Sequence, residues 1–410
     1  MKSDFIDKTA CRICSRAGLV PVLDLGVMPP ANAFLKEGDL RKPEQKFPLV
    51  LCFCPKCGLA QLSVVVDPAI LFRHYDYFTS ASAPLAEHFI RSADNLVKRF
   101  IKSKNDLVLE IGGNDGVLLA SVLDRCRALN IEPAENIAAA SRERGVETLN
   151  EFFSSSLAGR ILKTHGKARL IVANNVIAHV DDVSDVFLGV KSLLADEGAF
   201  VLEVHWVGNL IGDGGFDQIY HEHLSYFSLG ALQYLARSLG LEIFDAELIP
   251  IHGQSLRVYI GQGFDESPSI GEILKKEKNL GLDTAKPFLQ FAERVEKSRR
   301  ELYELFSRLK KEGKTIAGYG APAKGNTLLN YFGIDNKLMD FITDTTPAKQ
   351  GLFTPGSHIP IRPPETISQK TPDYMVLLAW NYADAIVKKE SGFRERGGKF
   401  IIPVPEVKIT

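Results

Sequence analysis

The sequence has no long apolar run and almost no net charge. No stretch of its 410 residues approaches the roughly 20 apolar residues that a membrane helix needs, so we expect no membrane span. The N-terminal MKSDFIDKTACRIC has neither a long apolar core nor a cleavage-like end, so we expect no secretion signal and a cytoplasmic location. A formal net charge of −1 disfavours a broad electrostatic grip on nucleic acid or anionic lipid, although it is compatible with a local basic patch.

Short internal repeats and low-complexity tracts are also absent. The composition, 45% apolar and 24% charged residues, is that of an ordinary globular protein. Because 410 residues exceed the usual size of one hydrophobic core, we expect two or three domains.

Cysteine is scarce and unevenly placed. Cys52 and Cys126 stand outside any pair, and we expect the first to be a bystander and the second a core residue. The other four form two C-x-x-C pairs, Cys11, Cys14, Cys54 and Cys57. Two such pairs can direct four sulfurs at one ion, and in a reducing compartment they favour a metal over disulfides. We predict zinc, with a redox or metal-free thiol set as the alternative. Four thiolates leave no open coordination position, so the zinc is expected to be structural.

Apolar periodicity divides the chain. Residues 1–72 are rich in turn residues and suit a small metal-held domain that closes with the strand-like LAQLSVVV. After a helical pattern in SAPLAEHFIRSADNLVKRFI, short apolar strands alternate with helix-sized segments, which predicts a parallel α/β sheet. The strand candidates are DLVLEIGG, ALNIEP, ARLIVANN and GAFVLEVH, with EIFDAELIP and SLRVYIG as a closing antiparallel pair. A long amphipathic helix over about 284–312 leads into a smaller α/β unit that begins at KTIAGYG.

The first strand of the α/β region runs into a glycine-rich turn. Gly112, Asn114 and Gly116 give G-x-N-x-G where a dinucleotide site needs G-x-G-x-x-G, so NAD binding is doubtful. Two acids, Glu110 and Glu132, end successive strands. These positions suit S-adenosylmethionine, with Glu132 accepting the two ribose hydroxyls. The alternative is an ordinary turn without a ligand.

Further polar groups are expected at the same edge of the sheet. The acidic loop, which includes Asp115, tolerates a sulfonium and an amino group. The third strand candidate ends in Asn174, Asn175 and His179, at the carboxyl edge where parallel sheets bind ligands.

The segment DQIYHEHLSYFS gathers Tyr220, His221, Glu222 and His223. If it is extended, the two histidines share one face and the other two residues share the opposite face, so all four converge only in an irregular loop. We expect His221 to be structural. The alternatives are hydrogen-bonded core histidines, or a metal site on H-x-H, which needs a third ligand such as His179 or His205.

Together the two C-x-x-C pairs, LEIGGNDG, YHEHLSYFS and GYGAPAKGNT resemble the S-adenosylmethionine-dependent sugar C-methyltransferases, which act on nucleotide-linked keto-deoxysugars. The resemblance runs from Cys11 to about FIIPVPEV, nearly the whole chain. It implies a zinc-binding domain over 1–72, a Rossmann-like methyltransferase domain over 73–265, and a C-terminal Rossmann-like α/β domain over 266–410 that helps hold the nucleotide-sugar.

The resemblance also implies catalytic roles. Methylation of carbon needs a carbanion equivalent, so a base must remove the proton beside the ketone while the enolate oxygen is stabilised. The residues that match the family's active site are His223 as the base, its partner Tyr220, then Glu222 and His179, and a tyrosine from the N-terminal side, Tyr75 or Tyr77.

In the C-terminal unit, G-x4-G in GYGAPAKGNT has the spacing of a phosphate loop. Asn326 stands where such a loop needs lysine, which argues against ATP hydrolysis. Backbone amides and Lys324, with Lys349 from TDTTPAKQG, are instead expected at a sugar diphosphate. Asn326 is also expected to bind the substrate, and His252 and Ser255 are weaker candidates for the same cleft. The alternative for each lysine is a solvated side chain on a packing turn.

We therefore expect a C-methyltransferase that uses S-adenosylmethionine and structural zinc, with no nucleic-acid or membrane partner. One alternative is a zinc-ribbon RNA methyltransferase, which predicts a basic face. A non-catalytic binding protein is another. An oxidoreductase or isomerase of sugar nucleotides is the third, and the missing dinucleotide fingerprint weighs against it.

Overall fold

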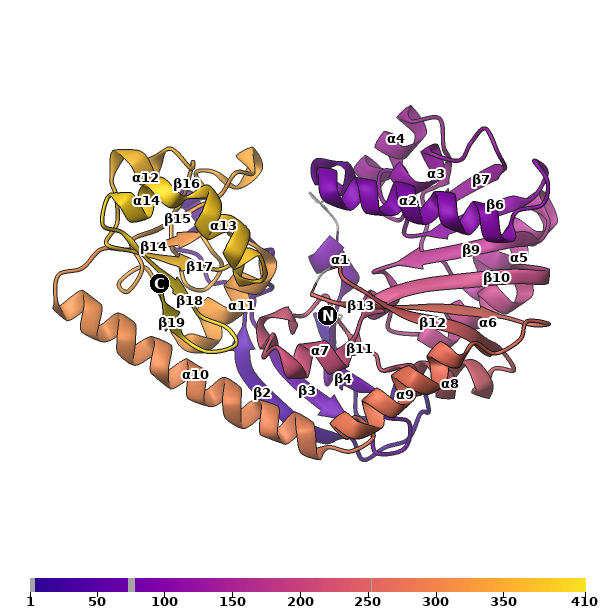
Figure 1. Cartoon of the computed structure of the whole chain (residues 1–410), viewed down its shortest axis with the longest axis horizontal. Helices are drawn as coiled ribbons and strands as arrows, with labels where there is room; N and C mark the ends of the chain where they lie inside the picture. The colour runs from indigo at the N-terminus through magenta and orange to yellow at the C-terminus, as the bar shows by residue number, and fades with distance from the viewer. Residues whose placement is uncertain (1–3, 73–77, 252) are drawn as a thin grey trace.

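The computed structural model describes residues 4–72, 78–251 and 253–410 (Figure 1). The sequence predictions for Tyr75, Tyr77 and His252 therefore lie outside the described residues. Within the described residues, no helix combines the length and the apolar character that crossing a membrane requires.

The N-terminal unit is built on an antiparallel sheet in the order β11-β4-β3-β2. Its strands are β2 (Val20–Met28), β3 (Phe47–Phe53), β4 (Ala60–Leu62) and β11 (Ser225–Tyr226). A small second sheet pairs β1 (Phe5–Asp7) with β5 (Val64–Val66). The strand β11 comes from the middle of the chain, directly after the Tyr220–His223 segment, so this sheet anchors that segment.

The central sheet has seven strands in the order β12-β13-β10-β9-β6-β7-β8. The parallel strands are β6 (Leu107–Ile111), β7 (Arg127–Ile131), β8 (Glu147–Leu149), β9 (Ala168–Asn174) and β10 (Leu194–His205). The antiparallel pair β12 (Glu242–Ile249) and β13 (Ser255–Gly261) closes the β10 edge. The predicted parallel sheet and its closing pair are confirmed. The short strand β8 was not predicted.

Helices cover both faces of the central sheet (Figure 1). Alternate residues of each strand belong to different cores, as the two-residue period of a strand requires: Leu109 and Ile171 pack on one side, Val108 and Val172 on the other. The first core includes α5 (Ser155–His165), α6 (Val183–Leu193) and α8 (Leu229–Ser238), and the second includes α2 (Ala83–Phe100). The remaining helices of this region are α3 (Val117–Ala120), α4 (Glu135–Glu143) and α7 (Val207–Gly212).

Two helices lead to the C-terminal unit. The first, α9 (Pro268–Leu280), packs on β12 and α8 of the central region. The second, α10 (Lys286–Lys311), is the long helix expected over 284–312, and it runs along the lower edge of the molecule past β2 (Figure 1). Its apolar face carries Phe288, Phe291 and Leu302, all buried.

The C-terminal unit is a second α/β layer structure with strand order β16-β15-β14-β17-β18-β19. Its strands are β14 (Ile316–Tyr319), β15 (Phe341–Thr343), β16 (Ile361–Arg362), β17 (Tyr374–Leu377), β18 (Lys399–Ile402) and the antiparallel β19 (Lys408–Ile409). Its helices are α11 (Ala323–Phe332), α12 (Thr366–Gln369), α13 (Ala383–Lys389) and α14 (Ser391–Glu395). The predicted α/β class is confirmed for both large units.

Candidate active site

The four cysteines of the C-x-x-C pairs form one cluster, with all sulfurs within 4.8 Å of one another. The Sγ atoms of Cys11 and Cys57 are 3.4 Å apart, and those of Cys14 and Cys54 are 3.5 Å apart. Zn–S bonds of about 2.3 Å in a tetrahedron place sulfurs slightly under 4 Å apart, so the cluster fits a closed zinc site. Cys52 lies outside the cluster, and burial raises the pKa of its thiol to about 11.

The glycine-rich turn after β6 has the backbone of a ligand-binding loop. Gly112, Asn114 and Gly116 all have positive φ, at 64°, 50° and 74°. The amide of Gly113 donates to Asn130 Oδ1 at 3.0 Å. A Cβ at residue 113 would lie only 2.4 Å from that oxygen, so a residue without a side chain is needed there.

Glu132, at the end of β7, holds this loop. Its two carboxylate oxygens accept the amides of Asn114 at 3.1 Å and Ala134 at 2.9 Å. Asp115 is fully buried and paired with Arg144 at 3.0 Å, so its described contacts are structural. Each Glu132 oxygen keeps a second lone pair for a ligand hydroxyl.

A group of buried polar atoms lies at the carboxyl ends of β6 and β9. Glu110 Oε2, Asn174 Nδ2 and Asn175 Oδ1 are buried and have no hydrogen-bond partner among the described residues. Burial raises the pKa of Glu110 to about 8; the neighbouring Asn174 side chain opposes this shift, and the negative charges of Glu132 and Asp115 act in the same direction as burial. Such a set fits a cationic ligand that also donates hydrogen bonds, as the sulfonium and amino group of S-adenosylmethionine do.

The DQIYHEHLSYFS segment forms a turn before it enters β11. The amide of His223 donates to the carbonyl of Tyr220 at 2.9 Å, which brings the two side chains together with ring centroids 4.1 Å apart. The segment is therefore the irregular loop that sequence reasoning kept open, not an extended strand.

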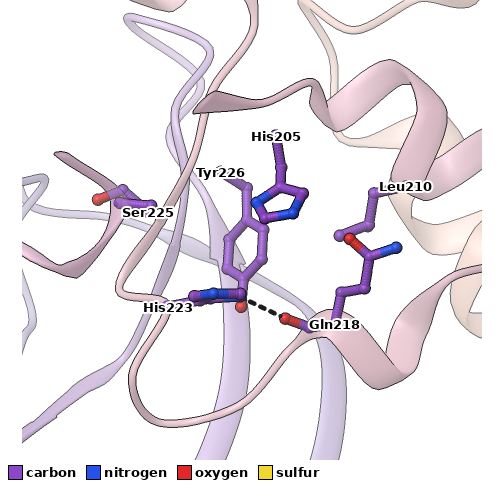
Figure 2. A pocket seen from close by; sticks show the side chains of 7 residues that line it. His205, Leu210, Gln218, His223, Ser225 and Tyr226 are labelled. Carbon is purple, nitrogen blue, oxygen red and sulfur yellow. Dashed lines mark hydrogen bonds between the residues drawn. The ribbon is translucent and has the colours of Figure 1, made fainter. Parts of the chain in front are cut away.

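The hydrogen bonds of His223 define its tautomer. Nδ1 lies 2.8 Å from the carbonyl oxygen of Gln218, which can only accept, so Nδ1 carries the hydrogen (Figure 2). Nε2 lies 3.0 Å from the Tyr220 hydroxyl. In the neutral ring, Nε2 is therefore the basic nitrogen, and the tyrosine hydroxyl donates to it.

Other aromatic side chains surround this imidazole. The ring centroids of His179 and His205 are 5.0 Å and 5.4 Å from that of His223. Burial lowers the pKa of His179 to about 4, so this ring is neutral near pH 7. A cavity of about 10 Å³, room for about one water molecule, is lined by Ala178, His205, Leu210, Gln218, His223, Ser225 and Tyr226 (Figure 2).

The remaining two residues of the segment have hydrogen-bond partners of their own. His221 is buried, contacts the Phe47 carbonyl through Nε2 at 3.2 Å, and packs edge-on against the Phe47 ring. It therefore does not chelate a metal together with His223, as the H-x-H alternative required. Glu222 is 4% exposed and accepts a hydrogen bond from Asn32 Nδ2 at 2.7 Å.

The predicted diphosphate residues lie apart from the histidines. Lys324 Nζ is 4.4 Å from the Trp380 ring centroid and donates to Asn381. Lys349 Nζ donates to the Ala321 carbonyl at 2.9 Å. Both lysines have lowered pKa values because they are partly buried.

Two other predicted substrate residues, Asn326 and Ser255, are buried in the protein. Asn326 is 1% exposed and gives its amide to the Ala31 carbonyl at 2.6 Å. Ser255 is fully buried and donates to the Ile251 carbonyl at 3.2 Å.

A larger cavity of about 350 Å³ lies between the central region and the C-terminal unit. It is lined by Asn209, Asp213, Gln218, Gly253, Trp380, Asn381, Ile402, Val404 and Pro405. Gln218 borders both this cavity and the small one beside His223. Most of the residues that line the larger cavity were not predicted from the sequence. Asp217 was not predicted either; it is fully buried and accepts the Trp380 indole N–H at 2.7 Å.

Three protein-family models match consecutive parts of the chain: a zinc binding domain over residues 11–72, a methyltransferase domain over 85–246, and a C-methyltransferase C-terminal domain over 250–405. The C-methyltransferase NovU of Streptomyces niveus is 38% identical over 403 residues, which cover 97% of this chain and 96% of the relative.

Solved methyltransferase structures align with less than half of the chain. Magnesium protoporphyrin IX methyltransferase (ChlM) from Synechocystis PCC 6803, solved with bound SAM, aligns over 43% of this chain and 78% of its own, at 11% identity and a TM-score of 0.33. The YcgJ protein of Bacillus subtilis aligns over 42% of this chain and 96% of its own, at 13% identity and a TM-score of 0.33. At these scores the structural likenesses support no conclusion, whereas the full-length identity and the domain models do.

Proposed function

The chain belongs to the family of S-adenosylmethionine-dependent C-methyltransferases with a zinc-binding domain, and we propose that it is a cytoplasmic enzyme that methylates the carbon beside the ketone of a nucleotide-linked keto-deoxysugar. The family membership favours the predicted enzyme over a non-catalytic binding protein. All six cysteines lie among the described residues and none of them forms a disulfide, which suits a reducing compartment.

The observation that carries the proposed mechanism is the orientation of His223. The Gln218 carbonyl keeps the hydrogen on Nδ1, so Nε2 is the nitrogen that removes the sugar proton. When Nε2 takes up that proton, the same carbonyl accepts a hydrogen bond from the resulting imidazolium and stabilises it. The hydroxyl of Tyr220, 3.0 Å from Nε2 in the present arrangement, then donates to the enolate oxygen formed at the ketone.

The cofactor would be held at the carboxyl edge of the central sheet. Glu132 would accept the ribose hydroxyls, and Glu110 with Asn174 and Asn175 would receive the amino-acid end, where one buried polar atom of each has no hydrogen-bond partner among the described residues. When bound, S-adenosylmethionine supplies an electrophilic methyl group. The residues around it supply orientation and exclude water, which is the main requirement for transfer from an already activated donor.

We place the nucleotide end of the substrate toward the C-terminal unit. The 350 Å³ cavity has Gln218 on the histidine side and Trp380 and Asn381 on the other, and Lys324 adjoins this tryptophan. In this arrangement the sugar occupies the side near Glu222, His179 and His223, while Lys324 and Lys349 bind the diphosphate. Tyr75 or Tyr77 would complete the sugar site.

The test separates deprotonation from methyl transfer. The enzyme is incubated with keto-sugar nucleotides and methyl-labelled cofactor, and NMR locates the label. In parallel, exchange of the sugar proton is followed in D2O with the cofactor product in place of the cofactor. We expect label on carbon, and His223→Gln should abolish both reactions. Label only on oxygen or nitrogen, or proton exchange that survives His223→Gln, would refute the proposal.

A further inference from the structure

The loop between β2 and β3 of the zinc-binding domain reaches the proposed active site. Asn32 in this loop is exposed, yet its side-chain amide donates to Glu222 Oε1 at 2.7 Å across 190 residues of sequence. This distance is typical of a hydrogen bond to a charged oxygen. No other hydrogen bond to the Glu222 carboxylate is formed by the residues that the structure describes, so Oε2 accepts none from them.

The backbone on both sides of Asn32 is fixed to the C-terminal unit. The carbonyl of Ala31 accepts the Asn326 amide at 2.6 Å, and Leu35 exchanges two backbone hydrogen bonds with Phe353, at 2.9 Å and 2.8 Å. Asn326 lies on α11, directly after the glycine loop. The position of Asn32 therefore depends on the C-terminal unit as well as on its own domain.

The Glu222 carboxylate needs such a partner because it is buried. Burial raises its pKa to about 7, and the Asn32 amide opposes this shift. Neighbouring titratable groups are directed elsewhere: His221 contacts the Phe47 carbonyl, and His223 contacts Gln218 and Tyr220. The ring of His179 contacts the backbone of Glu222.

We propose that Asn32 is a positioning residue of the active site, which anchors Oε1 of Glu222 and so leaves Oε2 to accept a hydrogen bond from a hydroxyl of the substrate. The loop that carries Asn32 thereby links the glycine loop of the C-terminal unit to the proposed sugar site. This inference rests on the proposed function in treating Glu222 as an active-site residue.

The kinetic test uses Asn32→Ala, Asn32→Asp, Glu222→Gln and the double variant Asn32→Ala/Glu222→Gln. Asn32→Ala should lower kcat about 10- to 100-fold, the range for a lost hydrogen bond to a charged group, with KM for the cofactor unchanged. The acidic limb of its pH–rate profile should move to higher pH, because the group that lowers the Glu222 pKa is gone. Asn32→Asp should move it further, because a second carboxylate then faces the first.

The matched control is Glu44→Gln. Glu44 also joins the zinc-binding domain to the C-terminal unit, through His358 at 2.7 Å and the Gly356 amide at 2.8 Å, but it does not contact Glu222. It should retain kcat within about twofold. If Glu44→Gln matches Asn32→Ala, the loss reflects a loosened domain contact and the inference is overturned. It is also overturned if the losses of Asn32→Ala and Glu222→Gln multiply in the double variant, because residues that act together give a smaller combined loss.

A crystal structure of Asn32→Ala provides a second test that requires no substrate. We expect the Glu222 side chain to leave its present position while His223 keeps its contact with Gln218. An unchanged Glu222 rotamer would overturn the inference. If the wild-type enzyme methylates no keto-sugar but Glu222 moves in the variant, then the proposed function fails and the positioning role stands.

Discussion

Removal of the Arg257 charge tests how much the buried ion pair between Arg257 and Glu203 contributes to stability. Glu203 on β10 is fully buried, and its Oε2 contacts Arg257 at 3.1 Å and His88 at 3.2 Å. The substitution Arg257→Met keeps most of the side-chain volume and strips this carboxylate of its cation. Breaking a buried ion pair from one side destabilises a protein by about 3–5 kcal/mol. Because Glu203 keeps His88, we expect the lower end, about 3 kcal/mol.

The loss should depend on pH in a defined direction. Burial alone would raise the pKa of Glu203, but the hydrogen bond from His88 and the charge of Arg257 outweigh it and hold the pKa below its usual value. In the wild type, this group therefore adds stability at neutral pH, which is lost as the pH falls through its lowered pKa. In Arg257→Met, burial dominates and raises the pKa of Glu203. The carboxylate is then protonated at a higher pH than in the wild type, and protonation removes the free-energy cost of a buried, unpaired charge. The difference between the two proteins should be largest at pH 7.5 and shrink toward pH 5.5.

The same variant should weaken cofactor binding. The backbone carbonyl of Glu203 accepts the Asn175 amide at 2.7 Å and holds that residue at φ 55°, next to Asn174. A shift of the unpaired carboxylate would displace this turn. Isothermal titration with S-adenosylhomocysteine should therefore show weaker binding by Arg257→Met.

The assay is urea-induced unfolding followed by circular dichroism, with two controls. In the double variant Glu203→Gln/Arg257→Met, no buried charge is left alone, so it should recover about 2 kcal/mol of the loss. Lys102→Met removes one partner of an exposed ion pair, Lys102–Glu197 at 2.8 Å, and should change stability by under about 1 kcal/mol. The reasoning fails if the double variant is as unstable as Arg257→Met, or if the loss is the same at both pH values.

Three shorter predictions concern the metal, the cofactor and the base. Cys54→Ser, or zinc chelation, should lower the melting temperature and reduce the metal content below one zinc per chain by mass spectrometry, because four thiolates share one ion. Glu110→Gln should weaken S-adenosylhomocysteine binding about tenfold by calorimetry, the order expected for one charged hydrogen bond, while unfolding changes little. Tyr220→Phe should slow sugar proton exchange about 10- to 100-fold without a change in melting temperature, since it removes only a hydroxyl that contacts Nε2 of His223.

Local patterns were sufficient to predict six of the seven strands of the central sheet, all except β8. Strands such as β6 and β9 are continuous apolar runs because both of their faces are buried, and that pattern is legible without a structure. The pairing of β11 with β4 was not predictable in this way. Its two residues, Ser225 and Tyr226, carry no strand pattern, and the register is set by contacts with a strand more than 160 residues earlier, Gln61 facing Ser225.

The candidate site shows the same division between local and distant information. The cysteine pairs and the G-x-N-x-G turn are local motifs, and their residue types alone indicate metal binding and a ligand-binding loop. Gln218 was missed because it fixes His223 through its backbone carbonyl, a group that every residue has. Asn326 was expected at the substrate, but the structure gives its amide to Ala31, a contact across 295 residues for which the sequence offers no local sign.

The zinc site is connected to the histidine cluster through Arg12, which lies between two of the cysteine ligands. Its backbone amide donates to Gln61 at 2.8 Å, and Gln61 faces Ser225 of the strand that follows His223. Its guanidinium is buried and contacts Asp181 at 3.1 Å, two residues after His179. When Cys11 and Cys14 bind the ion, the backbone at Arg12 between them is fixed. Arg12 in turn holds β11, which follows His223, through Gln61, and holds the segment after His179 through Asp181. Four thiolates leave the ion no position for substrate, so zinc binding acts on catalysis indirectly, by stabilising the fold that places these side chains.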